Sequence, residues 1–408
     1  MEKVEGEASE ELQLHPTPAK PRFIPRLGHR QERLGVLLAK QGVTMTVSPL
    51  YYMAHNPELA LFTARKPPLG LALDPATHLR QVPHPDRASA FRALPFGHEP
   101  QAFDPDHSPI GERAYAELVT APLDLARARG ATLLLPAYHQ TGAVGSRGRS
   151  LDLALARDAL AHFRAQRMEE PPELAVVPVR RELYVVLALP CGLLESARER
   201  RRLAEAYLAL EPDGFWVKLA GFDERARRTL IKAGGAFLAL LASGGRPVVA
   251  DGPGQLHLGL LTNDISTSIG LAESERFLGP QLRSRDDWTR GRTRTIYHPK
   301  YLRSFRAGGE GVARAFAGSR CACKRHAARQ PPSGPAIGEH AAIVRAREAR
   351  EALDGDVLER REWLLANAAM ASHRAHDAGV DYTPSVVFEA LLEGIDSIDR
   401  DELAETAY

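Results

Sequence analysis

Three kinds of feature are scarce or missing in this 408-residue sequence, and each absence excludes a class of protein. Only three cysteines occur, too few for a disulfide framework, and two of them form one Cys-x-Cys pair that is free to bind metal. No apolar run reaches the roughly 20 residues that a membrane-spanning helix needs, and the acidic N-terminus does not look like a signal peptide. We therefore expect a cytoplasmic protein with reduced cysteines and no membrane contact.

The glycine-rich motifs that bind nucleotide cofactors are also missing. No Gly-x-Gly-x-x-Gly follows a first predicted strand, and no Gly-x-x-x-x-Gly-Lys-Ser/Thr motif occurs. The sequence therefore gives no support for a dinucleotide or nucleoside-triphosphate cofactor.

Charge is nearly balanced overall but is distributed unevenly along the chain. The net charge is +2, yet residues 281–330 contain thirteen Lys or Arg against three Asp or Glu, and residues 351–408 contain four against fourteen. A basic segment beside an acidic one predicts a surface that faces a polyanion, next to an acidic tail or cap. The alternative is an arginine-rich surface without a ligand.

Short apolar runs alternate with helical patterns from residue 42 onward. Parallel strands joined by right-handed crossover helices produce this alternation. About eight such units predict a TIM (β/α)8 barrel, and an open doubly wound sheet is the alternative. Strands are expected at Val43–Val47, Leu69–Leu73, Thr132–Leu135, Leu174–Val179, Tyr184–Leu189, Phe215–Leu219, Pro247–Ala250 and around Ile265, and helices at 150–168, 195–210 and 225–241.

The composition divides the chain into four expected parts. The first lacks hydrophobic periodicity and should be a mobile lead-in. The proline-rich stretch 76–112 predicts a loop over Asp74 that can act as a lid. The expected parts are the lead-in 1–41, a catalytic barrel 42–315, a zinc-binding segment 316–350 and an acidic helical region 351–408.

Three metal-ligating side chains stand within six residues, Cys321, Cys323 and His326. A tetrahedral zinc ion needs a fourth ligand, and His340 at the start of a predicted helix can supply it. Sulfur and imidazole together favour zinc, and four protein ligands predict a closed structural site. Without metal, these residues would be two buried cysteines and two surface histidines in a basic loop. Alternative fourth ligands are His373 and His376.

Two aspartates follow or adjoin predicted strands, Asp74 after Leu69–Leu73 and Asp264 beside Ile265. Catalytic groups of barrel enzymes lie at strand ends. A pair of carboxylates can divide nucleophilic attack and proton transfer between them, as in retaining glycosyl transfer. Each also has a structural interpretation, because Asp74 before Pro75 suits a turn and Asp264 can cap a helix.

Other polar side chains at predicted strand ends are candidates for substrate binding. Amide and imidazole groups can read the edge of a base, and arginine can hold phosphate. The alternative is that they are solvated strand ends. These candidates are His139, Gln140, Arg180 and Lys218. Aromatic residues among the cations of the basic segment can stack unpaired bases, or they can be half-buried on a basic surface. They are Trp288, Tyr297, His298 and Tyr301.

The order of these features resembles the tRNA-guanine transglycosylase superfamily (queuine and archaeosine tRNA-ribosyltransferases). That family carries Cys-x-Cys-x-x-Cys and a later histidine on a subdomain after the barrel, and here Cys321, Cys323 and His326 stand in the first three places. The resemblance maps the family's nucleophilic aspartate onto Asp264 and the aspartate of its Asp-Ser-Gly-Gly-Phe motif onto Asp74.

The resemblance also implies a base-binding set. The family's base-contacting Gly-Gly strand corresponds to Lys218-Leu219-Ala220-Gly221, which brings Gly221 into the set. Where the family reads guanine, this chain has His139 and Gln140, and Arg180 stands in place of a Gln-Gly-Gly motif. The Ser-Gly-Gly-Phe run after the first aspartate is absent, which marks a divergent member, nearer the DNA-modifying branch.

By this resemblance the chain is a zinc-containing TIM barrel that replaces guanine in DNA or tRNA with a 7-deazaguanine base, through a covalent aspartyl intermediate. An accessory subunit that kept the barrel and the zinc but binds nucleic acid without catalysis is the alternative, motivated by the missing glycine motifs. Either a homodimer or a heterodimer is expected. An unrelated zinc-dependent barrel hydrolase is a third hypothesis, although a four-ligand site disfavours it.

Overall fold

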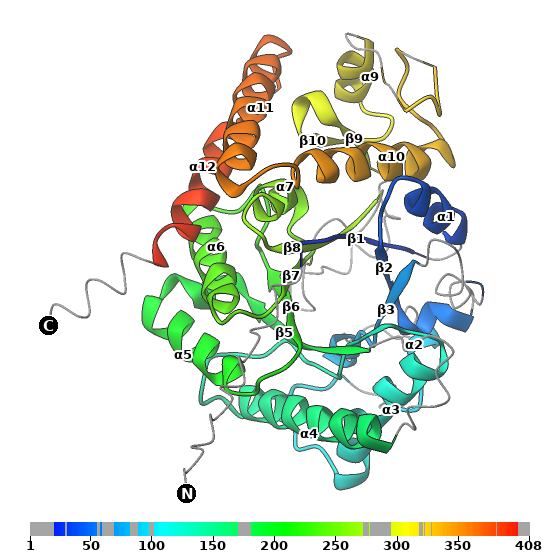
Figure 1. The fold of residues 1–408 in the computed structure, drawn as a ribbon, viewed down its shortest axis with the longest axis vertical. Helices are drawn as coiled ribbons and strands as arrows, with labels where there is room; N and C mark the ends of the chain where they lie inside the picture. The colour runs from blue at the N-terminus through cyan, green and yellow to red at the C-terminus, as the bar shows by residue number, and fades with distance from the viewer. Residues whose placement is uncertain are drawn as a thin grey trace, which may run out of the picture.

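Eight parallel strands close into a barrel in a computed structural model of the chain (Figure 1). The predicted TIM barrel is thereby confirmed. The strands are β1 (Phe23–Arg26), β2 (Met45–Pro49), β3 (Gly70–Asp74), β4 (Leu133–Leu134), β5 (Glu182–Pro190), β6 (Gly214–Ala220), β7 (Val248–Asp251) and β8 (Ser266–Gly270). The structure describes residues 20–28, 31–54, 58, 69–81, 89–97, 102–169, 181–271, 277, 295–317, 321, 323–327, 329–380 and 382–398.

The first barrel strand lies earlier in the chain than expected. β1 pairs in parallel with β8 and with β2, so it closes the barrel from within the segment predicted to be a mobile lead-in. Its four residues contain only Phe23 and Ile24 as large apolar side chains, too few to show periodicity. The predicted strand Leu174–Val179 lies outside the described residues.

The predicted crossover helices are present with small shifts at their ends. Ser196 caps α5 by accepting a hydrogen bond from Glu199 N, as a helix-initiating serine does. The helices around the barrel are α1 (Glu32–Lys40), α2 (Ser89–Arg92), α3 (Glu112–Ala128), α4 (Arg147–Glu169), α5 (Ala197–Leu208), α6 (Arg228–Ser243) and α7 (His257–Leu261).

Side chains alternate along each strand between two apolar clusters. One cluster fills the barrel interior and includes Ile24, Val47, Val186, Trp216 and Val249. The other lies between strands and helices and contains their sequence neighbours. At the carboxyl ends of the strands the interior positions change from apolar to charged, as at Arg26, Asp74, Lys218 and Asp251. The core therefore supports a polar layer at the barrel mouth.

The chain after β8 forms an antiparallel pair, β9 (Thr295–His298) with β10 (Arg303–Arg306), followed by α9 (Glu310–Ala317). It then enters α10 (Ala336–Glu351), which packs against α1, β1 and α7 (Figure 1). α10 thus takes the place of the eighth barrel helix. The metal-ligand segment is an insertion between β8 and this helix, so the expected boundaries at 315 and 350 do not match the structure.

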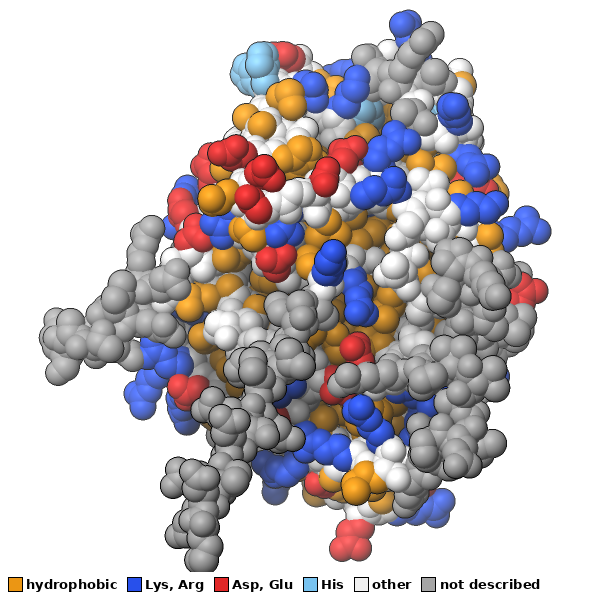
Figure 2. Space-filling model, viewed as in Figure 1, with side chains coloured by type: hydrophobic (Ala, Val, Ile, Leu, Met, Phe, Trp, Pro, Cys, Tyr) orange, Lys and Arg blue, Asp and Glu red, His pale blue; other side chains and the backbone are white. Residues whose placement is uncertain are grey.

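Two further helices follow in the described part of the chain, α11 (Val357–Asp377) and α12 (Pro384–Ile395). α11 begins with a capping box between Asp356 and Glu359, and α12 packs against α6. Figure 2 shows acidic side chains gathered over this side of the molecule, as the expected acidic cap requires. Exposed carboxylates on and beside these helices are Asp354, Asp356, Glu359, Glu362, Asp377, Glu389, Glu393 and Asp396. Among the described residues, no helix combines the length and apolar content needed to cross a membrane.

Candidate functional site

Four charged side chains from four strands meet at the barrel mouth. Arg26, Asp74 and Asp251 are the last residues of β1, β3 and β7, and Lys218 lies near the end of β6. Because parallel strands place their carboxyl ends together, these residues share one end of the barrel. The side chains of Asp74, Lys218 and Asp251 are each about 1% exposed.

Asp74 has hydrogen-bond donors on both carboxylate oxygens. Lys218 Nζ lies 3.0 Å and Arg26 Nη1 3.1 Å from Oδ2. Oδ1 accepts from the Tyr138 hydroxyl at 2.9 Å and from the backbone N–H of Ala76 at 2.9 Å. The His78 Nδ1 lies 2.8 Å from the same hydroxyl. Asp74 is therefore held rigidly at the carboxyl end of β3, and Tyr138 links it to His78.

Among the described residues, only one carboxylate oxygen of Asp251 has hydrogen-bond or ion-pair partners. Its Oδ2 accepts from Trp216 Nε1 at 2.9 Å and forms ion pairs with Lys218 and Arg26. No described donor bonds its Oδ1. Lys218 thus bridges Asp74 and Asp251, which keeps their Oδ2 atoms within about 6 Å, two hydrogen-bond lengths.

The two cations keep both carboxyl groups ionised. Burial alone would raise the pKa of Asp74, but Lys218 and Arg26 hold it well below its usual range. Burial opposes ionisation of Asp251 in the same way, and Arg26 and Lys218 lower its pKa. Two ionised carboxylates beside one ammonium group can act as nucleophile and proton acceptor.

Three consecutive residues after β4 carry buried polar atoms without a described partner. They are both ring nitrogens of His139, Oε1 of Gln140 and Oγ1 of Thr141. Burial lowers the pKa of His139 well below its usual value, so its ring is neutral. Gln140 bridges to Ala188 of β5, which pairs with Lys218 of β6, so Gln140 and Lys218 lie on the two sides of β5. Such unpaired buried groups call for a ligand or ordered water.

The structure contradicts the expected pairing of Asp264 with Asp74. Residues 257–261 form α7, so Asp264 lies in the turn that enters β8, at the amino end of the strand. Its side chain is 55% exposed and bonds Arg360 of α11 at 2.9 Å. Asp74 ends its own strand, so the two carboxylates lie at opposite ends of a parallel barrel and cannot flank one sugar.

The remaining predicted site residues have mixed outcomes. Gly221 directly follows β6 with φ +83°, a conformation that favours glycine, and no described atom lies within 4 Å of the place where a Cβ would stand. Arg180 and Trp288 lie outside the described residues. The expected base-stacking role does not fit Tyr297, 1% exposed, or His298, 3% exposed, because both rings are buried in the metal-bearing insertion.

Sequence reasoning missed Arg26, Tyr138, Trp216 and Asp251. Asp251 had the same signal that selected Asp74, a carboxylate at the carboxyl end of a buried apolar run, here Pro247–Ala250. The Gly-Pro-Gly that follows Asp251 is equally typical of a turn that ends a strand. Arg26 carried no usable signal, because β1 is too short to be recognised.

The predicted metal ligands come together in a second site. The ligand atoms of Cys321, Cys323, His326 and His340 lie within 4.8 Å of one another. His340 Nδ1 lies 3.4 Å from Cys321 Sγ, 3.3 Å from Cys323 Sγ and 3.3 Å from His326 Nε2. Edges of about 3.3–3.8 Å follow from tetrahedral bonds of about 2.0–2.3 Å, so these residues fit a metal ion.

Neighbouring backbone groups orient the ligands. His340 Nε2 lies 2.7 Å from the carbonyl oxygen of Tyr297, which fixes the proton on Nε2 and leaves Nδ1 to bind metal. Backbone N–H groups of Cys323 and Arg325 lie 3.5 Å from the sulfurs of Cys321 and Cys323. Burial lowers the pKa of His340 to about 4, which keeps its ring neutral as a ligand must be.

Comparison with known proteins does not identify a function, so a functional assignment depends on the geometry of the two sites. No protein-family model and no characterised protein sequence matches the chain.

Proposed function

We propose that the barrel mouth catalyses glycosyl transfer on a nucleic acid, replacing guanine with a 7-deazaguanine base through a covalent aspartyl intermediate. The observation that carries this proposal is the pair Asp74 and Asp251 on one ammonium group, with Asp251 Oδ1 left unbonded by described residues. Asp251 takes the nucleophilic role expected of Asp264. DNA and tRNA are both substrates that this chemistry accommodates.

The residues divide the reaction into two displacements. Asp251 Oδ1 attacks C1′ of the nucleotide, the bond to the base breaks, and Lys218 gives a proton to the departing base. The nitrogen of the incoming base then attacks C1′ and releases Asp251. Asp74 passes the proton lost by that nitrogen back to Lys218, so protons balance. The target base must leave its stack to reach a barrel mouth.

Unpaired polar groups that follow β4 support recognition of the base. His139, Gln140 and Thr141 supply unpaired buried donors and acceptors, and Gly221 leaves room for close approach. A base edge that pairs with these atoms would remove the cost of leaving them unsatisfied.

Trapping the intermediate tests this proposal. Labelled guanine is offered with single-stranded DNA or tRNA, and base exchange and a denaturation-stable complex are measured. Asp251→Asn should abolish both, with a loss of at least about 1000-fold. Asp264→Asn is the matched control and should keep both activities. If the Asp251→Asn variant were as active as the wild-type protein, Asp251 would be eliminated as the nucleophile.

A second candidate function rests on the ion pairing itself. Every oxygen of Asp74 and the Oδ2 of Asp251 already has a charged or polar partner. A barrel mouth whose carboxylates are already paired fits an accessory subunit, which would bind nucleic acid and associate with a catalytically active partner. In that case Asp251→Asn would leave nucleic-acid binding unchanged, and no preparation of the chain alone would exchange base.

We also propose zinc as the metal of the Cys321, Cys323, His326 and His340 cluster. Two sulfurs and two imidazoles match its preference, and four protein ligands leave no open position for catalysis. Its role is therefore structural. Metal analysis of the purified protein should find about one zinc per chain, and a different metal or none would reject the assignment.

A further inference from the structure

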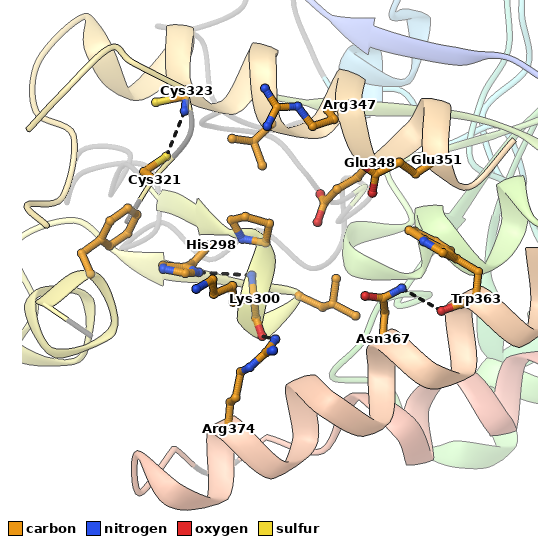
Figure 3. A pocket seen from close by; sticks show the side chains of 14 residues that line it. His298, Lys300, Cys321, Cys323, Arg347, Glu348, Glu351, Trp363, Asn367 and Arg374 are labelled. Carbon is orange, nitrogen blue, oxygen red and sulfur yellow. Dashed lines mark hydrogen bonds between the residues drawn. The ribbon is translucent and has the colours of Figure 1, made fainter. Parts of the chain in front are cut away.

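A cavity of about 260 Å³ lies between the metal-bearing insertion and the C-terminal helices (Figure 3). Apolar walls come from Pro299, Leu302, Phe316 and Val344, and the indole of Trp363 forms another side. Within the described parts of the chain the cavity shares no lining residue with the barrel mouth, and two of the metal ligands, Cys321 and Cys323, lie on its wall. A small, mainly apolar cavity with a few polar groups is the usual form of a ligand site.

One buried carboxyl group faces this cavity without a complete set of partners. Glu348 is 7% exposed, and its Oε1 accepts from the Tyr297 hydroxyl at 3.1 Å. Its Oε2 has no hydrogen-bond partner among the described residues. Burial raises the pKa of Glu348 to about 8. A buried polar atom left unpaired beside a cavity is costly unless a ligand or water completes it.

A second polar group lines the same cavity. The Asn367 amide donates through Nδ2 to the carbonyl oxygen of Trp363 at 2.8 Å, and its oxygen points into the cavity (Figure 3). Glu348 can donate or accept at Oε2 according to its protonation, whereas Asn367 Oδ1 only accepts. Together, these two groups are complementary to the edge of a heterocyclic ring that presents an N–H donor beside a nitrogen acceptor.

Cations lie on both sides of the cavity, and the carboxylates lie on one. Lys300 and Arg374 lie at one end, and Glu348 and Glu351 lie across the cavity from them (Figure 3). Arg347, a third cation, lies on α10 beside these carboxylates (Figure 3). A ligand with a flat polar head and an anionic group at its other end complements this arrangement. A guanidinium or ammonium ligand would meet repulsion from the cations.

We propose that this cavity is a second binding site, which takes a nucleotide whose base carries an amino group beside a ring nitrogen. The base stacks on Trp363 and pairs with Glu348 and Asn367, and its phosphate lies toward Lys300 and Arg374. Adenine and cytosine present this edge. The site does not depend on the glycosyl transfer proposed for the barrel mouth.

Calorimetry with the full metal-loaded chain tests the site, using AMP as the probe. Inosine monophosphate reverses the donor and acceptor on the same ring, and purine riboside monophosphate lacks the amino group. Each should bind at least about 10-fold more weakly than AMP. Adenosine, without phosphate, should also bind more weakly. Equal binding of AMP and inosine monophosphate would overturn the proposal. Absence of AMP binding at about 1 mM would also overturn it and would mean that the cavity holds only water.

Matched variants assign the binding to this cavity. Glu348→Leu removes the group that pairs with the ring nitrogen and should weaken AMP binding at least about 10-fold. Glu362→Leu makes the same change at an exposed position on α11 and should leave AMP binding unchanged. Metal content and melting temperature are measured for both, so that a folding defect is recognised. Unchanged AMP affinity in Glu348→Leu would place the nucleotide elsewhere.

Two further binding measurements distinguish this site from the barrel mouth and identify the form of its ligand. Asp251→Asn should leave AMP binding intact, so failure of the barrel-mouth proposal does not affect this one. A short oligoadenylate is compared with AMP to identify the source of the nucleotide. Tighter binding of the oligomer indicates a polymer, and equal binding indicates a free nucleotide.

Discussion

At the scale of single residues, the position of a carboxylate on its strand decides what it can do. Asp251 ends β7 and joins the buried cluster, whereas Asp264 precedes β8 and pairs with Arg360 at the surface. Both stand within fourteen residues of sequence. Their surroundings differ because a parallel barrel separates the two ends of every strand.

Lys218 is predicted to be the most sensitive residue of the mouth cluster. Lys218→Met removes the cation shared by Asp74 and Asp251 and leaves Arg26 as their remaining cationic partner in the described cluster. Losing one partner of a buried ion pair typically costs about 3–5 kcal/mol, because the other charge stays buried. Urea denaturation measures this loss.

Lys232→Met is the matched control for that experiment. Lys232 is 42% exposed and pairs with Glu393 at the surface. Exposed pairs contribute about 0–1 kcal/mol, so this variant should unfold within that range of the wild type. A Lys218 variant no less stable than the control would show that the cluster is not coupled to folding.

At the scale of elements, the metal ties an insertion to the barrel. Cys321, Cys323 and His326 belong to the insertion, and His340 belongs to α10, which packs against α1 and β1. A metal bound by all four joins the segment to a helix that the barrel core already holds.

Cys323→Ser should release the metal and loosen the insertion while the barrel stays folded. Hydrogen exchange should rise in residues 295–335, and peptides of the barrel strands should keep their protection. Cys191→Ser is the control, because Cys191 is buried near Leu230 and is not one of the ligands. Global unfolding on metal loss would instead mean that the barrel itself requires the metal.

The contact between α6 and α12 depends on a glycine. A methyl group added at Gly394 would overlap the backbone carbonyl of Lys232 on α6, which cannot move aside as a side chain can. Gly394→Ala should therefore destabilise the protein by about 1–3 kcal/mol in thermal or urea unfolding. Gly192→Ala should leave stability unchanged, because no atom of the described residues lies within 4 Å of the added methyl group.

At the scale of the whole molecule, the mouth cluster links stability to pH. The pKa values of Asp74 and Asp251 are lowered in the folded state relative to about 4 in the unfolded chain. Their ionisation therefore stabilises the fold fully above about pH 4, and the contribution disappears as pH falls toward the lowered values.

Asp74→Asn tests this linkage. The stability difference between wild type and variant should be largest at neutral pH and should shrink as pH falls below about 4, where the wild-type carboxyl group loses its advantage. Urea unfolding at several pH values measures it. A difference that grows toward low pH would contradict the assigned direction of the pKa shift.

Local signals in the sequence determined much of the molecule. Alternating apolar runs and helical patterns predicted the barrel, and the short-range spacing Cys321-x-Cys323-x-x-His326 with His340 predicted the metal site. Asp74 and Lys218 were found because each lies at or near the carboxyl end of a long buried strand. These signals are local, and burial of an apolar face makes them visible.

Only the tertiary structure decided which distant groups meet. β1 is too short for a periodic signal, so Arg26 was recognised only through its pairing beside β8. Asp251 and Asp264 looked alike in sequence until the strand bounds separated the two ends of the barrel. The cavity at Glu348 is formed by segments of the insertion and two helices, and packing between elements cannot be read from local periodicity.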